Sequence, residues 1–314
     1  MTSSNLLMQY QSECFEALKS VSKVSKPFEK VLMDTLKLFM AIPGKVNFLQ
    51  MGRYGEFSEQ TYRNNFENEA FDWFAFNEYL VRKVLNGKFL AIADAFFSKE
   101  TFVNPLLKEG FHVISRFRND AVLFYPTLQK PTGKRGHPKW YDGKVDFANL
   151  DLSRCEEIEV DKGRLIGLKA YSKSLKRSIK VVVWYPDEED TTKWQIYFST
   201  DDSMSTKDVI DCYRTRFQLE FCFRDAKHYA GLNDCQSTDL RKLEFHRNAS
   251  FASINIAKVA CKELGIPFSI SSCKSIIHNA YMLNRFICVF GLQPDSQVID
   301  KLFKELVLFT ARAA

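Results

Sequence analysis

Apolar residues at helical spacing and short apolar runs at strand spacing follow one another along the chain, a pattern that predicts a mixed α/β protein. Helical periodicity covers residues 28–41 and 71–85, and each stretch ends at a turn-forming pair. A buried strand at 89–94, a helix at 97–110 and a second strand at 111–117 come next. This strand–helix–strand order predicts two neighbouring parallel strands.

The end of the first predicted strand carries a carboxylate, Asp94. Sheets of α/β proteins place their functional sites at the carboxyl ends of parallel strands, so Asp94 is a candidate site residue. The second strand ends in a basic pair, Arg116 and Arg118, which we expect to alternate along a strand edge. Of the two, Arg118 is the residue at which we expect a phosphate contact to be possible.

Residues 46–66 resemble a helix-turn-helix in their pattern. A short helix leads to a turn around Tyr54-Gly55, and a second helix begins after Ser58, its expected N-cap. Residue types that contact DNA project from that second helix: Thr61, Arg63, Asn64 and Asn65. An ordinary helical hairpin explains the same pattern equally well, and the sequence leaves both interpretations open.

A basic segment, residues 126–145, interrupts the apolar pattern with Gly, Pro and positive charge. Its cationic residues are Lys130, Lys134, Arg135, His137, Lys139 and Lys144. Charge of one sign on a loop favours phosphate binding, and a solvated surface loop is the alternative. Lys134, Arg135 and Lys139 are therefore candidate DNA-binding residues.

Short strands and long helices make up the rest of the chain. The strands are expected at 156–160, 164–172, 178–186 and 194–200, and they form hairpins inserted into the core. A helix follows at 206–229, and the tail from 237 to 314 is mainly helical. Within that tail we expect His246 at a helix surface or cap.

The helix at 206–229 mixes aromatic and charged residues. Four polar residues fall within roughly 60° of one another at about 100° per residue: Tyr213, Arg216, Glu220 and Lys227. The apolar residues Phe217, Leu219, Phe221 and Phe223 predict that this segment is packed into the protein. A salt bridge between Arg216 and Glu220 accounts for two of the four. The full set suits a divalent metal bound by the carboxylate, with phosphates held by the cations and the phenol. The second carboxylate that such a metal needs is expected from Asp94.

Composition narrows the functional classes. The 314 residues are 46% hydrophobic, with a formal charge of +6, so a core is available and nucleic acid is a permitted partner. No apolar run reaches the roughly 18 residues of a membrane span, and the start lacks the features of a signal peptide. Eight cysteines without a CxxC pair are expected to be reduced thiols in a cytoplasm.

The spacing Tyr213-x2-Arg216-x3-Glu220-x6-Lys227 resembles the YREK signature of DDE insertion-sequence transposases of the IS-four-like branch. The surrounding residues 194–238 are similar to that family's strand-to-helix segment. Residues 94–121 resemble the segment with its second catalytic aspartate, and residues 130–144 the basic loop that opens its β-rich insertion.

The resemblance implies an RNase H-like core that binds Mg²⁺, or Mn²⁺ in its place, for phosphodiester hydrolysis and strand transfer at transposon ends. Asp94 matches the second catalytic aspartate and Glu220 the glutamate, so both are expected as catalytic residues and metal ligands. Tyr213, Arg216 and Lys227 match positions that handle DNA-end phosphates. The implied partners are double-stranded transposon-end and target DNA, with self-association on DNA and no membrane. The implied location is the bacterial cytoplasm, at the nucleoid.

The chain departs from the family pattern at the first catalytic aspartate. Before Asp94 it offers only Asp34 and Asp72, which lie in helical segments rather than at strand ends. The segment 89–94 looks like the first-aspartate strand from upstream and the second-aspartate strand from downstream. We hypothesise an internal deletion that fused the two strands near Asp94, which leaves the sheet and the metal site incomplete.

Three functions remain open on this sequence: a transposase, a DNA-binding derivative without catalysis that occupies ends or co-assembles with full-length transposase, and a metal-dependent nuclease. The expected organisation is a helical DNA-binding region at 1–86, a transposase core at 87–236 with an insertion at about 126–200, and a helical region at 237–314.

Overall fold

The computed structural model divides into two compact units. One unit comprises Met1–Asn86 with Phe221–Ala314, and the other comprises Gly87–Glu220. None of the helices in the described part of the chain has both the length and the apolar character needed to cross a bilayer. The structure describes residues 4–84, 89–128, 141–160, 162–187, 190, 192–291, 297, 298, 301 and 305.

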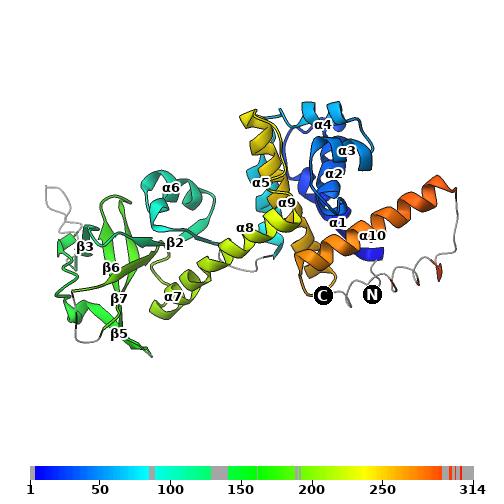
Figure 1. The fold of residues 1–314 in the computed structure, drawn as a ribbon. Helices are drawn as coiled ribbons and strands as arrows, with labels where there is room; N and C mark the ends of the chain where they lie inside the picture. The colour runs from blue at the N-terminus through cyan, green and yellow to red at the C-terminus, as the bar shows by residue number, and fades with distance from the viewer. Residues whose placement is uncertain are drawn as a thin grey trace. The chain divides into compact units, whose positions relative to one another are not determined.

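The helical unit joins segments from both ends of the chain (Figure 1). Its N-terminal helices are α1 (Ser4–Lys19), α2 (Lys26–Ala41), α3 (Phe48–Tyr54), α4 (Glu59–Asn65) and α5 (Trp73–Val84). Its C-terminal helices are α9 (Leu240–Glu263) and α10 (Ile270–Val289), preceded by the second part of α8 (Gln218–Tyr229). The helices predicted around residues 28–41 and 71–85 are confirmed as α2 and α5.

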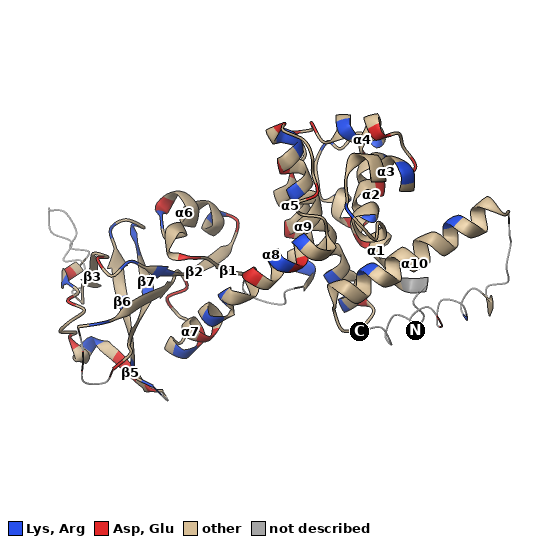
Figure 2. Ribbon diagram, in the orientation of Figure 1, with Lys and Arg blue, Asp and Glu red and all other residues tan. Residues whose placement is uncertain are grey.

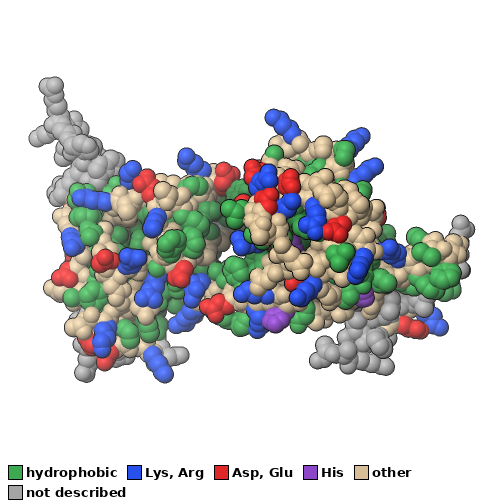
Figure 3. All heavy atoms as spheres, turned by 45° about the horizontal axis from the view of Figure 1, so that its top comes forward, with side chains coloured by type: hydrophobic (Ala, Val, Ile, Leu, Met, Phe, Trp, Pro, Cys, Tyr) green, Lys and Arg blue, Asp and Glu red, His purple; other side chains and the backbone are tan. Residues whose placement is uncertain are grey.

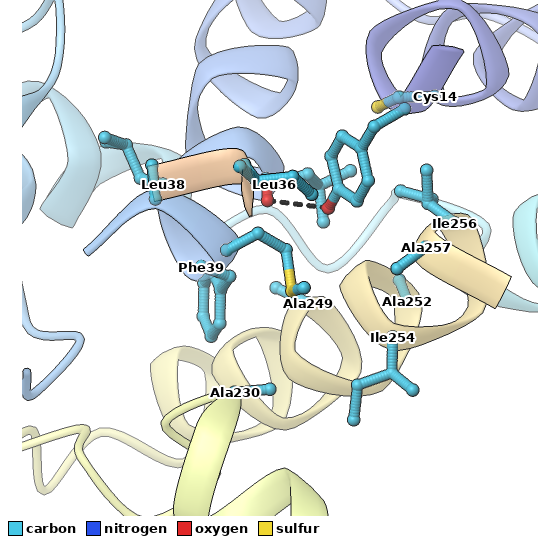
Figure 4. Close-up of a cluster of buried hydrophobic side chains, with 14 of the residues drawn as sticks. Cys14, Leu36, Leu38, Phe39, Ala230, Ala249, Ala252, Ile254, Ile256 and Ala257 are labelled. Carbon is cyan, nitrogen blue, oxygen red and sulfur yellow. Dashed lines mark hydrogen bonds between the residues drawn. The ribbon is translucent and has the colours of Figure 1, made fainter. Parts of the chain in front are cut away.

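A single apolar core holds these helices together (Figure 4). Cys14 of α1 and Phe39 of α2 belong to the same buried cluster as Ile256 of α9. The Tyr10 hydroxyl, fully buried, donates to the Leu36 carbonyl at 2.8 Å, so its polar atom is satisfied inside the core. The burial of α1, α2 and α9 together shows that neither end of the chain can form this core alone.

Helices α3 and α4 lie where the sequence predicts a helix-turn-helix pattern. Ser58 caps α4 as expected, because its hydroxyl accepts the Thr61 N–H at 3.2 Å. Two of the residues expected to contact DNA form bonds within α4 itself. Arg63 pairs with Glu59, and Asn65 donates to the Thr61 carbonyl at 2.9 Å. DNA contact by α4 stays a prediction.

A buried ion pair fastens the turn between α3 and α4 to α2. Lys37 Nζ lies 2.7 Å from Asp34 Oδ1, and both side chains are buried. The other oxygen, Asp34 Oδ2, accepts from the Glu56 N–H at 3.1 Å and from the Tyr62 hydroxyl. Burial and then Asp34 raise the pKa of Tyr62, so its phenol remains a donor. A Cβ at Gly55 would lie 1.9 Å from that hydroxyl, so only glycine fits the turn.

His246 is buried in α9, so the expectation of a helix-surface or capping position is wrong. Its Nε2 stands 2.7 Å from the Gly231 carbonyl, which accepts the proton of the neutral ring. Burial lowers the pKa of His246, although the Gly231 carbonyl and Asp234 oppose this effect.

Acidification is expected to destabilise the helical unit through His246. The unfolded chain binds a proton near the ordinary histidine pKa of about 6.5, whereas the folded chain resists it. Stability is therefore full above that pH and falls below it, by at most about 1.4 kcal/mol per pH unit. Urea unfolding on both sides of that pH measures the effect. His246→Leu should flatten the profile and His228→Leu, at an exposed position, should not; equal profiles for both would contradict the assignment.

The sheet unit is built around one mostly antiparallel open sheet. Its strands follow the order β1-β2-β8-β7-β6-β3-β4, with β5 paired to β6. They are β1 (Phe89–Ile92), β2 (Phe111–Phe117), β3 (Leu123–Pro126), β4 (Tyr141–Lys144), β5 (Cys155–Glu159), β6 (Arg164–Ser172), β7 (Arg177–Tyr185) and β8 (Gln195–Ser199). Strands β1 and β2 are parallel and joined by α6 (Glu100–Lys108), which confirms the predicted strand–helix–strand unit. The predicted hairpin strands pair antiparallel and continue the same sheet.

The two faces of the sheet have separate apolar cores. Val103 of α6 packs with one cluster of strand residues, which includes Val113 and Phe198. On the other face, helix α7 (Thr206–Arg214) buries Val209 and Ile210 against residues that include Ile114. Hydrophobic side chains also reach the surface among charged ones on the face shown in Figure 3.

Helix α7 approaches the sheet at a glycine. A Cβ at Gly167 of β6 would lie 1.9 Å from Thr206 Oγ1, so the Thr206 side chain packs directly against the strand backbone. Thr206 donates to Glu156 Oε2 at 2.8 Å, and Lys180 pairs with the same carboxylate at 3.0 Å. These contacts fix the start of the helix that carries Tyr213.

Candidate functional site

Asp94 lies at the carboxyl end of β1, where the sequence places it. The Ala93 N–H donates to the Ile114 carbonyl at 2.9 Å, and Ser115 Oγ donates to the Asp94 carbonyl at 3.0 Å. The backbone at Asp94 is thus tied to β2. Its side chain is 60% exposed, and Oδ1 accepts the Ala95 N–H at 2.7 Å as the cap of the short 3₁₀ helix η1 (Ala95–Phe97).

Tyr213 and Arg216 stand next to Asp94. The Tyr213 ring packs edge-on against Tyr197 of β8, with 4.8 Å between centroids. Burial and then the charge of Asp94 raise the pKa of Tyr213, while Arg216 and Arg116 oppose the shift. Arg216 Nη1 lies 3.9 Å from Asp94 Oδ2. The phenol therefore stays protonated, as a hydrogen-bond donor beside two cations and one carboxylate.

Arg116 belongs to this group of side chains, although its sequence context predicts a strand edge. Strand β2 lies between β1 and β8, and the Cα of Arg116 pairs with that of Tyr197. Burial raises the pKa of both Tyr197 and Tyr213, and the charge of Arg116 opposes this shift. We define Asp94, Arg116, Tyr213 and Arg216 as the strand-end cluster. Successive side chains of β2 alternate between the two faces of the sheet. This alternation would have predicted a position for Arg116 in the cluster if the sequence had shown that β2 is an internal strand.

The helix predicted at 206–229 is interrupted. Helix α7 ends at Arg214, and a 3₁₀ turn, η3 (Thr215–Phe217), precedes α8. A 3₁₀ turn advances about 120° per residue instead of 100°, so three such residues rotate the side chains of the next helix by roughly 60°. The rotation widens the predicted stripe only slightly, so a shared face for the four residues stays a prediction. Figure 2 shows charged residues of both signs along α7 and α8.

The expected burial of the helix is also wrong. Phe217, Leu219 and Phe223 are 51%, 45% and 49% exposed. Phe223 nevertheless makes an edge contact with Phe251 of α9, with 5.3 Å between ring centroids. Glu220 and Lys227 are exposed, and the division between the two compact units falls directly after Glu220. Asp94, Tyr213, Arg216 and Glu220 thus belong to the sheet unit, and Lys227 belongs to the helical unit.

The basic segment proposed for DNA binding is only partly represented in the structure. Lys144 is exposed in β4. The candidates Lys134, Arg135 and Lys139 lie outside the described residues, as do Lys130 and His137.

The described residues around Asp94 do not fit a divalent metal. Among the described residues, no group of three or more His, Cys, Asp and Glu side chains could hold a metal ion. One oxygen of Asp94 caps η1, and the other faces the Arg216 guanidinium. The two aspartates considered as alternatives, which precede Asp94 in the sequence, form contacts within the helical unit. Asp34 pairs with Lys37, and Asp72 accepts the Ala75 N–H at 2.9 Å. Mg²⁺ prefers six oxygen ligands in near-octahedral geometry, which this set does not offer.

A cavity of about 350 Å³ lies beside Tyr213, between α7 and the sheet. Its lining includes the aromatic rings of Trp184, Tyr197 and Tyr213, the cations Lys207 and Arg214, and the carboxylates Glu159 and Asp211. The rings could stack on bases, but the two carboxylates balance the two cations, and Arg214 already pairs with Asp211 at 3.6 Å, so the cavity is not a phosphate site by charge.

Comparison with known protein families gives a match over the middle of the chain. A family model described as the transposase DDE domain matches residues 74–256, more than half of the chain. No curated protein matches the chain. The mixed α/β unit with its mostly antiparallel open sheet is consistent with an RNase H-like domain of that family.

Proposed function

The chain belongs to the transposase DDE domain family, and on this premise we propose that it acts in DNA transposition as a DNA-binding chain whose own metal site is incomplete. The observation that carries the proposal is the strand-end cluster, in which Arg216 rather than a further carboxylate faces Asp94. The assignment to the YREK-signature branch and the internal deletion belong to this proposal.

Phosphate binding is the role that the cluster fits best. Arg116 and Arg216 present planar guanidinium groups, and Tyr213 adds a neutral hydroxyl donor. Each contact to a phosphate neutralises charge and releases counterions, so binding should weaken as salt rises. Lys227 and the basic segment with Lys134, Arg135 and Lys139 are proposed to add further contacts to transposon-end DNA.

The proposal differs from the family in the number of carboxylates that bind the metal ion. Transposase DDE domains generally use divalent metal ions, and Mg²⁺ is the ion proposed for this chain. Asp94 and Glu220 would be its ligands. Two exposed carboxylates offer too few ligands for a stable site, so the chain by itself is not expected to cleave DNA.

Mg²⁺-dependent hydrolysis and strand transfer by Asp94 and Glu220 is the second candidate function. Its support is the position of Asp94 after a parallel strand, where α/β sheets place functional groups.

DNA binding should depend on the two arginines of the cluster. Arg116→Gln with Arg216→Gln is expected to weaken binding to a duplex with the DNA that flanks this reading frame by about tenfold or more. The slope of log K against log salt should fall by about two, one for each lost phosphate contact. Lys193→Gln, at an exposed loop position paired with Asp190, is the matched control and should bind normally. Unchanged affinity in the double variant would refute the phosphate role.

Cleavage separates the two candidate functions. With Mg²⁺ or Mn²⁺, the chain alone is expected to leave the same duplex intact, as followed by denaturing gel electrophoresis of end-labelled strands. Robust cutting that disappears in Asp94→Ala would instead establish the catalytic function and reject the incomplete site.

A further inference from the structure

Three aromatic rings lie together on the neighbouring strands β4, β3 and β6. The ring centroids of Phe124 and Tyr141 are 4.5 Å apart, and those of Tyr141 and Tyr171 are 6.0 Å apart with planes inclined by 23°. Lys173 follows directly after β6, and its ammonium lies 4.5 Å from the Phe124 centroid and 4.8 Å from that of Tyr141. We define these four residues as the aromatic platform.

The pairing of the strands brings the three rings to one face of the sheet. Phe124 is the cross-strand partner of Tyr171. The register between β3 and β4 shifts just before Pro126, so that Tyr141 pairs with Pro126 and shares the face of Phe124. Lys144 lies opposite Phe124 on β4 and belongs to the same face.

Neither α6 nor α7 covers these rings in the described part of the chain. The β3 residues on either side of Phe124 belong to the core on the opposite face, together with residues of α6. Leu165 of β6 packs with α7, and Tyr171, an even number of positions further along, points to that same face. The apolar cluster beneath α7 nevertheless includes none of the three rings. All three remain half-buried at the surface.

The charge around the rings is positive. Lys144 and Lys173 are exposed, and in the described residues the Lys173 ammonium contacts the two rings rather than a carboxylate. The carboxylate next to Tyr141 in the sequence, Asp142, pairs with Arg154 at 3.1 Å. The basic segment connects β3 to β4 in the sequence. This face therefore offers ring surfaces beside cations whose charge is not balanced by the adjacent carboxylate.

We propose that the aromatic platform binds single-stranded DNA, with unpaired bases stacked on the rings and phosphates held by Lys144 and Lys173. Aromatic side chains beside a positively charged surface are the groups with which proteins hold single strands. The bases of a duplex already stack on one another, so the rings favour unpaired bases. An acidic peptide would match the lysines but would leave the rings without a stacking partner. The choice of DNA rests on the proposed function.

A labelled oligothymidylate of about twelve nucleotides tests the proposal with the full chain. It is expected to bind saturably in fluorescence anisotropy. An abasic strand with the same phosphates should bind about tenfold more weakly, because it cannot stack on the rings. This comparison needs no variant, so its result does not depend on the folding of one. Equal affinity for the two strands would show that the bases do not contribute and would overturn the proposal.

Variants of the platform separate the rings from the lysines. Tyr141→Leu with Tyr171→Leu keeps apolar side chains but removes two rings, and it should weaken binding by about tenfold or more. Tyr141→Phe with Tyr171→Phe, the matched control, keeps both rings and should bind normally. Lys173→Met should lower the slope of log K against log salt by about 0.7, the value for one phosphate of a single strand. A leucine variant that is folded by circular dichroism and binds normally would contradict the role of the rings.

Photo-cross-linking locates the bound strand on the native chain. An oligothymidylate that contains iododeoxyuridine should cross-link to Tyr141 or Tyr171, because the halogenated base reacts with the ring on which it stacks. In the sheet order, β8, β7 and β6 separate β2, which carries Arg116 of the strand-end cluster, from β3. Cross-links confined to Tyr213 would place the strand at that cluster and overturn the inference. Duplex affinity is measured separately, so a failure of the proposed function would be recognised independently.

Discussion

Replacing Asp34 with alanine is expected to lower the free energy of unfolding by about 3–5 kcal/mol. The carboxylate is buried. It pairs with the Lys37 ammonium and accepts hydrogen bonds from the Tyr62 hydroxyl and the Glu56 N–H. Its removal leaves Lys37 buried with only Glu56, whose side chain is 68% exposed. Burial alone would lower the pKa of Lys37, and the charges of Asp34 and Glu56 raise it instead. Urea denaturation followed by circular dichroism measures the loss.

The double variant Asp34→Ala with Lys37→Met distinguishes the ion pair from a general packing defect. Removing both charges should recover a large part of the lost stability, because the main cost of the single variant is an unpaired buried ammonium. Asp72→Ala, which loses only an exposed capping bond, should cost about 1 kcal/mol. A single Asp34 variant as stable as Asp72→Ala would contradict the role given to this network.

Gly167→Ala is expected to destabilise the sheet unit by about 1–3 kcal/mol. The added methyl group would lie 1.9 Å from Thr206 Oγ1, and Thr206 is buried and bonded to Glu156, so it cannot turn aside without losing that bond. Helix α7 would have to move off β6. Thermal unfolding monitored by circular dichroism should show a lower midpoint.

Two companion variants locate the effect at this contact. Thr206→Ala removes the clashing oxygen, so Gly167→Ala should cost less in that background than in the native chain. Gly143→Ala is the matched control, because a Cβ at Gly143 meets no atom within 4 Å. A loss of stability at Gly143 as large as that at Gly167 would show that the close approach of α7 is not the cause.

Local patterns in the sequence were sufficient to predict the first part of the sheet unit. The run 89–94 is apolar, the helix after it has a clear period, and the second strand begins after Gly110. Parallel pairing follows because the helical connection between them is long enough for a crossover. Asp94 at the end of β1 follows from the same reasoning, since strand ends are set by local sequence.

Burial around α8 could not be predicted in this way. A run of Phe and Leu predicts an apolar surface, but the sequence does not show which other residues pack against that surface. Phe217 and Leu219 remain half exposed. The 3₁₀ turn η3 was missed for a related reason. Three residues are too few to distinguish a period of 3.0 from one of 3.6. The Thr215 hydroxyl donates to the Cys212 carbonyl, a local bond that threonine also makes in ordinary α-helices, so it gave no signal of the turn.

The position of Arg116 could not be predicted from local sequence, because it depends on pairing between strands that are distant in the chain. Its strand resembles an edge in sequence because arginines follow the apolar run. Only the pairing of β2 with β8, whose residues are some 80 positions further along, places it beside Tyr197 and Tyr213. Strand order in a sheet is set by contacts between distant segments, so the strand-end cluster could be predicted in part only.

The divided sequence of the helical unit has a consequence for its synthesis. Helix α1 packs against α9, which begins at Leu240, more than 200 residues later. At about 5–20 residues per second on a ribosome, α1 to α5 wait roughly 10–45 s for their partners. The sheet unit, Gly87–Glu220, is continuous and is complete before α9 emerges. Nascent chains should therefore acquire a folded sheet unit first, while the N-terminal helices remain available to chaperones until α9 has emerged.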